Sequence, residues 1–142
     1  MKRLEIVALI AGVVVIALST TACNRGAGSS PTATFTAFYE ASKNKDVEAA
    51  KKIFSKKTLE LFEIEAKAKN KTLDEMFKTG MDQKPPPDKL PEMRNEKING
   101  ENATLEVKDE QTGRWDTLTF VKEDGQWKIA LDKMGSQSPD AR

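Results

Sequence analysis

Three aromatic residues, Tyr39, Trp115 and Trp127, are the side chains of this chain best suited to contact a ligand. Each offers a broad apolar face with a polar group at its edge, a combination that binding pockets use. Tyr39 is expected either in a pocket wall or in ordinary packing. Trp127 shares a strand face with Ile129 and is expected in the core, whereas Trp115 is expected on the outer face, where it would contact a partner.

The residues needed for acid–base or metal chemistry are few. There is no histidine, which excludes Ser-His-Asp and Cys-His units and removes a common metal ligand. Glu60, Glu63 and Glu65 form a carboxylate cluster, and paired carboxylates transfer protons when burial separates their pKa values. Lysines on both sides of the cluster indicate instead a solvated helix face with ion pairs. Asp109–Glu110 borders a turn and is interpreted in the same way, so no catalytic residue, metal or cofactor is expected.

The only cysteine, Cys23, follows an apolar run near the start of the chain. Ile6–Leu18 is shorter than the roughly 20 residues that span a bilayer and is typical of a secretory signal peptide. Thr20-Thr21-Ala22 before Cys23 resembles the lipobox of a bacterial lipoprotein, with Thr20 in the usual place of leucine. The resemblance implies cleavage between Ala22 and Cys23 and a diacylglyceryl group on Cys23. An uncleaved anchor and an ordinary signal peptide are the alternatives.

Acylation would make the membrane the first partner, because two or three acyl chains hold a protein where one chain binds reversibly. The domain would then face the periplasm or the cell exterior. Asn24 is not the aspartate that the lipoprotein sorting rule associates with inner-membrane retention, so the outer membrane is expected if the cell has one. Residues 24–32 are small and polar and predict a flexible tether.

Charge is abundant but balanced. The 142 residues include 23 Lys and Arg and 22 Asp and Glu. Removing a leader that carries Lys2, Arg3 and Glu5 leaves 21 of each, so the expected mature chain is neutral. A neutral, mixed surface gives no basic face for nucleic acid and no polybasic segment for anionic lipid. The mature length predicts one domain that folds without disulfides.

Apolar residues recur at helical spacing in the first half of the domain. Asp46 is the expected N-cap of a second helix, Ser55 or Thr58 that of a third, and Thr72 precedes a fourth. The expected helices cover 34–43, 47–54, from 55 or 58 to about 69, and 73–80.

The second half predicts strands. Lys84–Pro91 is rich in proline, which lacks an N–H and fixes φ, so it is expected as a stiff connector, with a polyproline recognition motif as the alternative. Apolar residues then alternate with polar ones, and turn signals lie at Asn99–Gly100 and Asp124–Gly125. The expected strands cover 93–98, 103–108, 115–121 and 127–131.

Helices followed by an antiparallel sheet predict an α+β fold, in which the helices cover the apolar face of about four curved strands. Phe38–Ala41, Lys45–Ala50 and Val121–Ile129 resemble segments of small bacterial lipoproteins with a nuclear-transport-factor-two-like, or cystatin-like, domain of unknown function. The resemblance spans residues 33–133 and implies a cone with a pocket at its wide end. Enzymatic members place acid–base residues in that pocket, but no motif for them is matched here.

These observations predict a lipid-anchored, non-catalytic envelope protein. The leading expectation is a protein-interaction module, and the alternative is a small-molecule binder that holds a small apolar ligand in the cone. An open pocket lined by Tyr39 would favour the small molecule, whereas a filled cone beside an exposed Trp115 would favour the protein partner. The oligomeric state is left open, a homodimer included. The expected divisions are a signal peptide (1–22), a lipidated N-terminus and tether (23–32), an α+β domain (33–134) and a disordered tail (135–142).

Overall fold

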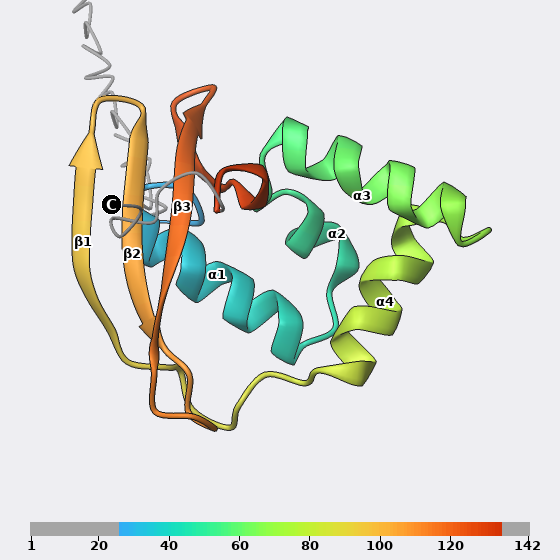
Figure 1. Cartoon of the computed structure of the whole chain (residues 1–142), viewed down its shortest axis with the longest axis horizontal. Coiled ribbons are helices and arrows are strands. Elements are labelled where there is room, and N and C mark those ends of the chain that lie inside the picture. The colour runs from blue at the N-terminus through green and yellow to red at the C-terminus, as the bar shows by residue number, and fades with distance from the viewer. Residues whose placement is uncertain (1–25, 135–142) are drawn as a thin grey trace, which may run out of the picture.

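The computed structural model describes residues 26–134 of the chain. The predicted signal peptide, the predicted cleavage site at Ala22 and Cys23, and the 135–142 tail lie outside the described residues. Within this range no helix has both the length and the apolar character needed to cross a bilayer. Four helices come first, followed by four strands and a short 3-10 helix (Figure 1). The elements are α1 (Pro31–Lys43), α2 (Val47–Lys51), α3 (Lys56–Ala68), α4 (Leu73–Gln83), β1 (Met93–Asn99), β2 (Asn102–Lys108), β3 (Trp115–Glu123), β4 (Gln126–Ile129) and η1 (Leu131–Lys133).

The strands form one antiparallel meander in the order β1-β2-β3-β4, which confirms the expected α+β class. Leu105 of β2 pairs with Leu118 of β3, so apolar side chains of neighbouring strands share a face. A β-bulge interrupts the pairing of β1 between Arg94 and Lys97, where Asn95 adopts a positive φ of 52°. The bulge adds a residue and bends the edge strand, a feature that the alternating pattern did not predict.

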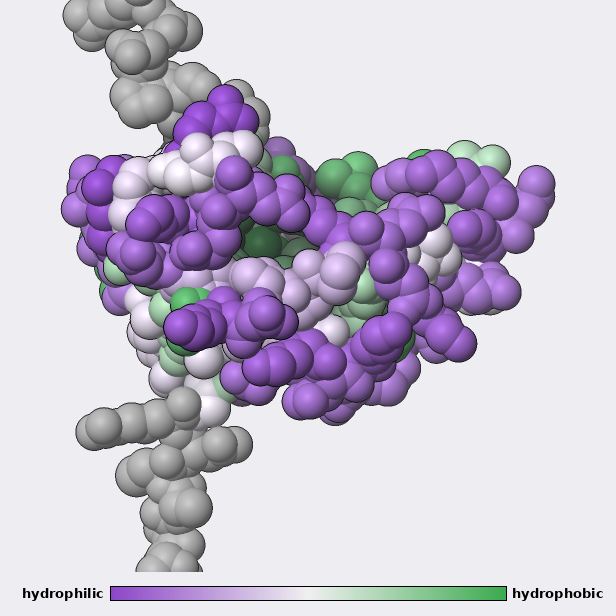
Figure 2. All heavy atoms as spheres, turned by 90° about the horizontal axis from the view of Figure 1, so that it is seen from below, coloured by the Kyte–Doolittle hydropathy of each residue, from purple (hydrophilic) through white to green (hydrophobic). Residues whose placement is uncertain are grey.

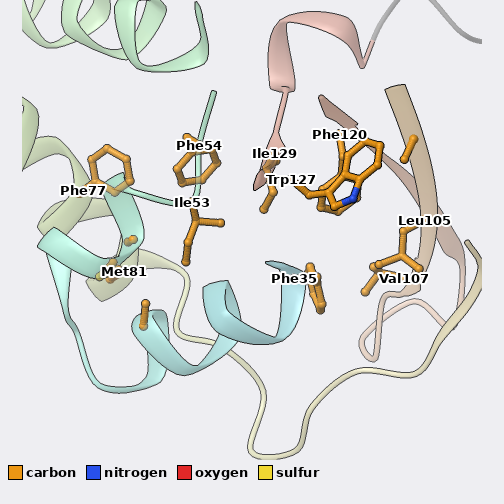
Figure 3. Packing of buried hydrophobic residues seen from close by; sticks show 13 residues of the cluster. Phe35, Ile53, Phe54, Phe77, Met81, Leu105, Val107, Phe120, Trp127 and Ile129 are labelled. Atoms are coloured by element: carbon orange, nitrogen blue, oxygen red, sulfur yellow. The ribbon is translucent and has the colours of Figure 1, made fainter. Parts of the chain in front are cut away.

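The core lies between the inner face of the sheet and the helices. Helix α1 crosses this face, while α3 and α4 extend away from the sheet as a pair (Figure 1). Phe120 and Leu105 are almost fully buried from the sheet side, and Phe35 of α1 packs opposite them (Figure 3). Burial of such side chains contributes about 1.5–3 kcal/mol each, which makes this layer the main source of stability.

Helix α1 begins at Pro31, three residues before the predicted start at residue 34. Ser30 is the N-cap, and its side chain accepts a hydrogen bond from the backbone N–H of Ala33. Pro31 takes the first helical position, where its missing N–H costs nothing. The chain is already attached to the sheet before this point, since the backbone N–H of Trp127 donates to the carbonyl of Gly28 at 2.9 Å.

The second helix is shorter than predicted and ends at Lys51. Ile53 and Phe54, expected on that helix, instead run alongside the end of β4. The N–H of Ile129 donates to the carbonyl of Ile53, and the N–H of Ser55 donates to the carbonyl of Ile129, both at 2.9 Å. Satisfying these backbone groups at the sheet edge outweighs continuing the helix.

Two other predicted ends were wrong. Helix α4 continues past Gly80 to Gln83, because Gly80 keeps a helical conformation and does not act as a left-handed cap. The last strand ends at Ile129, and Leu131 begins η1. The third helix begins at the first of its two predicted caps, Ser55.

A candidate ligand pocket

A cavity of about 770 Å³ lies between the sheet and the α3–α4 pair. Figure 2 shows a hollow on this side of the molecule, with hydrophobic residues at its floor and hydrophilic residues around it. Five of the six phenylalanines of the chain line the cavity. These are Phe35 and Phe38 from α1, Phe54, Phe62 from α3 and Phe77 from α4.

Phe54 is the centre of this aromatic wall. Its ring centroid lies 5.4 Å from those of Phe38 and Phe62, and 5.6 Å from that of Phe77. All three contacts are edge-to-face, an arrangement that contributes about 0.5–1.5 kcal/mol per pair beyond the buried area. The wall therefore joins α1 to the α3–α4 pair and leaves ring edges and faces directed at the cavity.

A second wall is the proline-rich segment 84–91, here called the proline strap, which is neither helix nor strand, as predicted. Five of its residues line the cavity, and four of these are prolines. Tyr39 ties the strap to α1: its hydroxyl lies 3.1 Å from the carbonyl oxygen of Pro87 and 2.9 Å from that of Asp88. The ammonium of Lys43 also donates to the carbonyl of Asp88, at 3.3 Å. Tyr39 is buried, lines the cavity and holds the strap in place.

The rim of the cavity carries charges of both signs. Lys69 pairs with Glu65 on α3, and Lys108 pairs with Glu92 at 2.7 Å. Lys71 donates to the hydroxyl of Thr79 at 3.5 Å, and its positive charge also acts on Glu75 of α4. The acids at the rim, Asp109, Glu110 and Asp116, come from the β2–β3 side.

Asp109 at this rim is a turn-forming residue. Its carboxylate accepts backbone N–H bonds from Thr112 at 2.9 Å and Gln111 at 2.8 Å. These bonds hold the pKa of Asp109 below its usual range, with a smaller contribution from the positive charge of Lys84. Asp109 therefore stays ionised at neutral pH.

Trp115 lies on the outer face of the sheet, as predicted, and takes no part in the cavity. The guanidinium carbon of Arg94 lies 3.9 Å from its ring centroid, and the Arg94 Nε donates to Glu106 at 2.6 Å. Hydrogen bonds from Arg94 and Asn95 lower the pKa of Glu106. The ring is half-buried beneath this ion pair.

Trp127 lies in the core with 4% of its surface exposed, as expected (Figure 3). It is not among the residues that line the cavity. Tyr39 is thus the one predicted aromatic residue that lines it. Sequence reasoning placed the phenylalanines in helix stripes but did not identify the pocket that they form.

The glutamate cluster on α3 is a solvated face, as expected. Glu60 and Glu65 pair with Lys57 and Lys69 on the same helix, and Glu63 is exposed. Among residues 26–134, no group of histidine, cysteine, aspartate or glutamate side chains has the arrangement of a metal site.

Four helices packed on a curved antiparallel sheet, with a cavity between them, define a nuclear-transport-factor-two-like domain. Residues 30–134 match the model of the family described as "Putative lumazine-binding". The match covers most of the chain, and the chain belongs to this family, which is of the nuclear-transport-factor-two-like class. No curated protein and no solved structure matches the chain.

Proposed function

We propose that the domain binds a small, largely apolar molecule in the cavity between the sheet and the α3–α4 pair. The supporting observation is the cavity of about 770 Å³ with five phenylalanines in its walls. Ligand sites commonly measure about 300–1,000 Å³ and are lined by aromatic side chains with a few polar groups. An apolar surface of this kind is costly to leave against water, and an apolar ligand would remove that cost.

The protein-interaction hypothesis has less support. It depended on an exposed Trp115 beside a filled cone. The Trp115 ring is covered by Arg94, and the space between the sheet and the helices is open. We therefore place the small-molecule binder first and include no catalytic step in the proposal.

A pair of tryptophan substitutions on β3 tests the pocket. The side chain of Leu118 lines the cavity, whereas its neighbour Thr117 is exposed and belongs to the opposite face of the strand. Leu118→Trp would fill the cavity from the sheet side, and Thr117→Trp would add the same ring outside it. The two variants share every other feature of the chain, so a difference between them reports on the cavity.

The probe is N-phenyl-1-naphthylamine, a neutral dye that becomes fluorescent in apolar surroundings. We expect the wild-type protein and Thr117→Trp to bind the dye alike, and Leu118→Trp to bind it about tenfold or more weakly, a change of about 1.4 kcal/mol. Equal binding by both variants, with both folded by circular dichroism, would contradict the proposal. In a separate experiment, displacement of the bound dye by lumazine would test whether the family description extends to this chain.

We also propose that the protein is anchored in the membrane by a lipid on Cys23. Support comes from the basic start, the apolar run and the small residues before the only cysteine. The mass of the mature protein purified from its own membranes tests this. We expect a chain that begins at Cys23 with an added diacylglyceryl mass, and a soluble chain for Cys23→Ser. An unmodified Cys23 in the mature protein would refute the anchor.

A further inference from the structure

Gly80 is a glycine whose presence the fold itself does not require. It lies inside α4, where glycine costs more backbone entropy than alanine. Its φ is not in the left-handed range, and a Cβ built on it would meet no atom within 4 Å. Neither a turn nor close packing of the protein therefore accounts for the missing side chain.

The space left by this glycine is part of the cavity. Gly80 lines the cavity together with Met76 and Phe77, one helical turn before it, and Lys84, one turn after it. Residues three and four apart share one face of a helix. That face presents apolar surface at one end, a notch at Gly80 and a positive charge at the other end.

The two lysines near this notch form no ion pair with a carboxylate of residues 26–134, although the charge of Lys71 acts on Glu75. Lys71 donates to the hydroxyl of Thr79, the residue beside Gly80. Lys84 makes no ion pair within this range, although the charge of Asp109 lies near enough to interact with it. The other rim lysines, Lys69 and Lys108, are each paired with a glutamate. A ligand that lies on α4 would meet positive charge from the residues that flank the helix at both ends, Lys71 before it and Lys84 after it.

We propose that Gly80 is a specificity-determining residue, and that the bound molecule carries a flat aromatic ring over Gly80 and an acidic group directed at Lys71 and Lys84. This inference rests on the proposed function and names the class of ligand for the same cavity. A flat ring fits a notch one side chain deep, and the surrounding phenylalanines offer edge-to-face contacts. An acidic group would form with both lysines the direct ion pair that neither makes within residues 26–134.

Two dyes that share one ring skeleton and differ in an acidic group separate the contribution of the ring to binding from that of the acid. The first is N-phenyl-1-naphthylamine, and the second, 8-anilinonaphthalene-1-sulfonate, adds a sulfonate to it. We expect the wild-type protein to prefer the sulfonate. The double variant Lys71→Met, Lys84→Met should lose that preference, with roughly a two- to fivefold loss for the sulfonate at this exposed rim and no change for the neutral dye. Equal losses for both dyes, or no loss, would overturn the acidic part of the proposal.

Leucine substitutions on α4 test the notch. Gly80→Leu would fill it, whereas Lys78→Leu adds the same side chain at an exposed position that does not line the cavity. We expect Gly80→Leu to lower the affinity for both dyes about tenfold, and Lys78→Leu to leave both affinities unchanged. Gly80→Ala, which occupies only part of the notch, should fall between them. Thermal unfolding checks that each variant is folded.

The outcomes separate this inference from the proposed function. If Leu118→Trp abolishes dye binding and Gly80→Leu leaves it intact, the cavity binds ligands but Gly80 does not select them, and this inference fails alone. If the wild-type protein binds neither dye, both proposals fail. Replacing the exposed Leu61 and Ile64 of α3 by serine removes apolar surface that lies outside the cavity. A loss of binding in that variant would assign the dyes to the outer surface and overturn the inference.

Discussion

The hydroxyl of Tyr39 lies 2.9 Å from the carbonyl oxygen of Asp88, a residue 49 positions later in the chain. This hydrogen bond attaches the proline strap to α1 across one side of the cavity. Prolines within the strap have no N–H with which to form a ladder, so carbonyl acceptors are what the strap can offer. The hydroxyl of Tyr39 therefore helps to hold the strap, one wall of the pocket, in place.

Replacing Tyr39 by phenylalanine should loosen the strap and leave the ring packing intact. We expect a loss of about 0.5–1.5 kcal/mol in the free energy of unfolding, the usual net value of one hydrogen bond. Backbone amides at the end of the strap and directly after it, those of Lys89, Leu90 and Glu92, should exchange hydrogen faster, and bound dye should dissociate faster. Hydrogen exchange by mass spectrometry and stopped-flow fluorescence measure these effects. Unchanged exchange in the strap would show that Tyr39 does not hold it.

The stacking of Arg94 on Trp115 should depend on pH through Glu106. The folded protein lowers the pKa of Glu106 below its ordinary value of 4.5, so the stabilisation is fully present above that value. It is lost as the pH falls through the lowered pKa, because a protonated Glu106 no longer holds the Arg94 guanidinium. The difference in tryptophan emission between wild type and Trp115→Phe should therefore change in this acidic range.

Glu106→Gln provides the control for that titration. Its Trp115 emission at pH 7 should resemble that of the wild type at low pH and should show no step on acidification. A step of the same size in Glu106→Gln would assign the titration to another carboxylate.

Two apolar residues on the same face of the sheet should differ sharply in their effect on stability. Leu105 is 1% exposed, whereas Ile98, which pairs with the buried Ala103 on the edge strand, is 55% exposed. Leu105→Ala should cost about 2–5 kcal/mol through lost contacts and a cavity. Ile98→Ala should change the free energy of unfolding by about 0.5 kcal/mol or less. Urea denaturation measures both, and similar losses would contradict the observed burial.

Two glycine-to-alanine substitutions should have opposite signs. Gly28 has a φ of +97°, and a Cβ there would lie 2.8 Å from the Cβ of Gln126. Gly28→Ala should therefore destabilise by more than about 1 kcal/mol. Gly80→Ala adds a methyl group in open space within a helix and should stabilise by about 0.5–1 kcal/mol. Melting temperatures that shift in the same direction would contradict the two environments.

The sheet could be predicted because its signals are local. Alternation with a period of two assigned Trp115 to the outer face and Trp127 to the core, and both placements are confirmed. Errors arose where a distant segment decided the structure. Phe54 follows helical spacing in the sequence, yet its neighbours bond to Ile129, and only the folded sheet reveals that competition.

The pocket was harder to predict for a related reason. The spacing of Phe62 and Phe77 predicts the core-facing stripes of amphipathic helices. It does not predict the distance between those helices and the sheet, which leaves both side chains at the cavity. That distance depends on how α3 and α4 pack against α1 and the strap. Gly80 was interpreted as a helix end, since the open space beside it exists only in three dimensions.

The hydrogen bond between Gly28 and Trp127 also limits how far the domain could lie from the membrane if Cys23 carries the proposed lipid. Only five residue steps separate Cys23 from Gly28, a reach of at most about 18 Å. The carbonyl of Gly28 is fixed at the edge strand β4, at the N-terminal end of α1, whereas the strap is tied to α1 near its C-terminal end, about a helix length away. A lipid on Cys23 would thus hold the domain close against the bilayer by its strand β4 end and leave the strap end, with the pocket beside it, directed towards the aqueous phase.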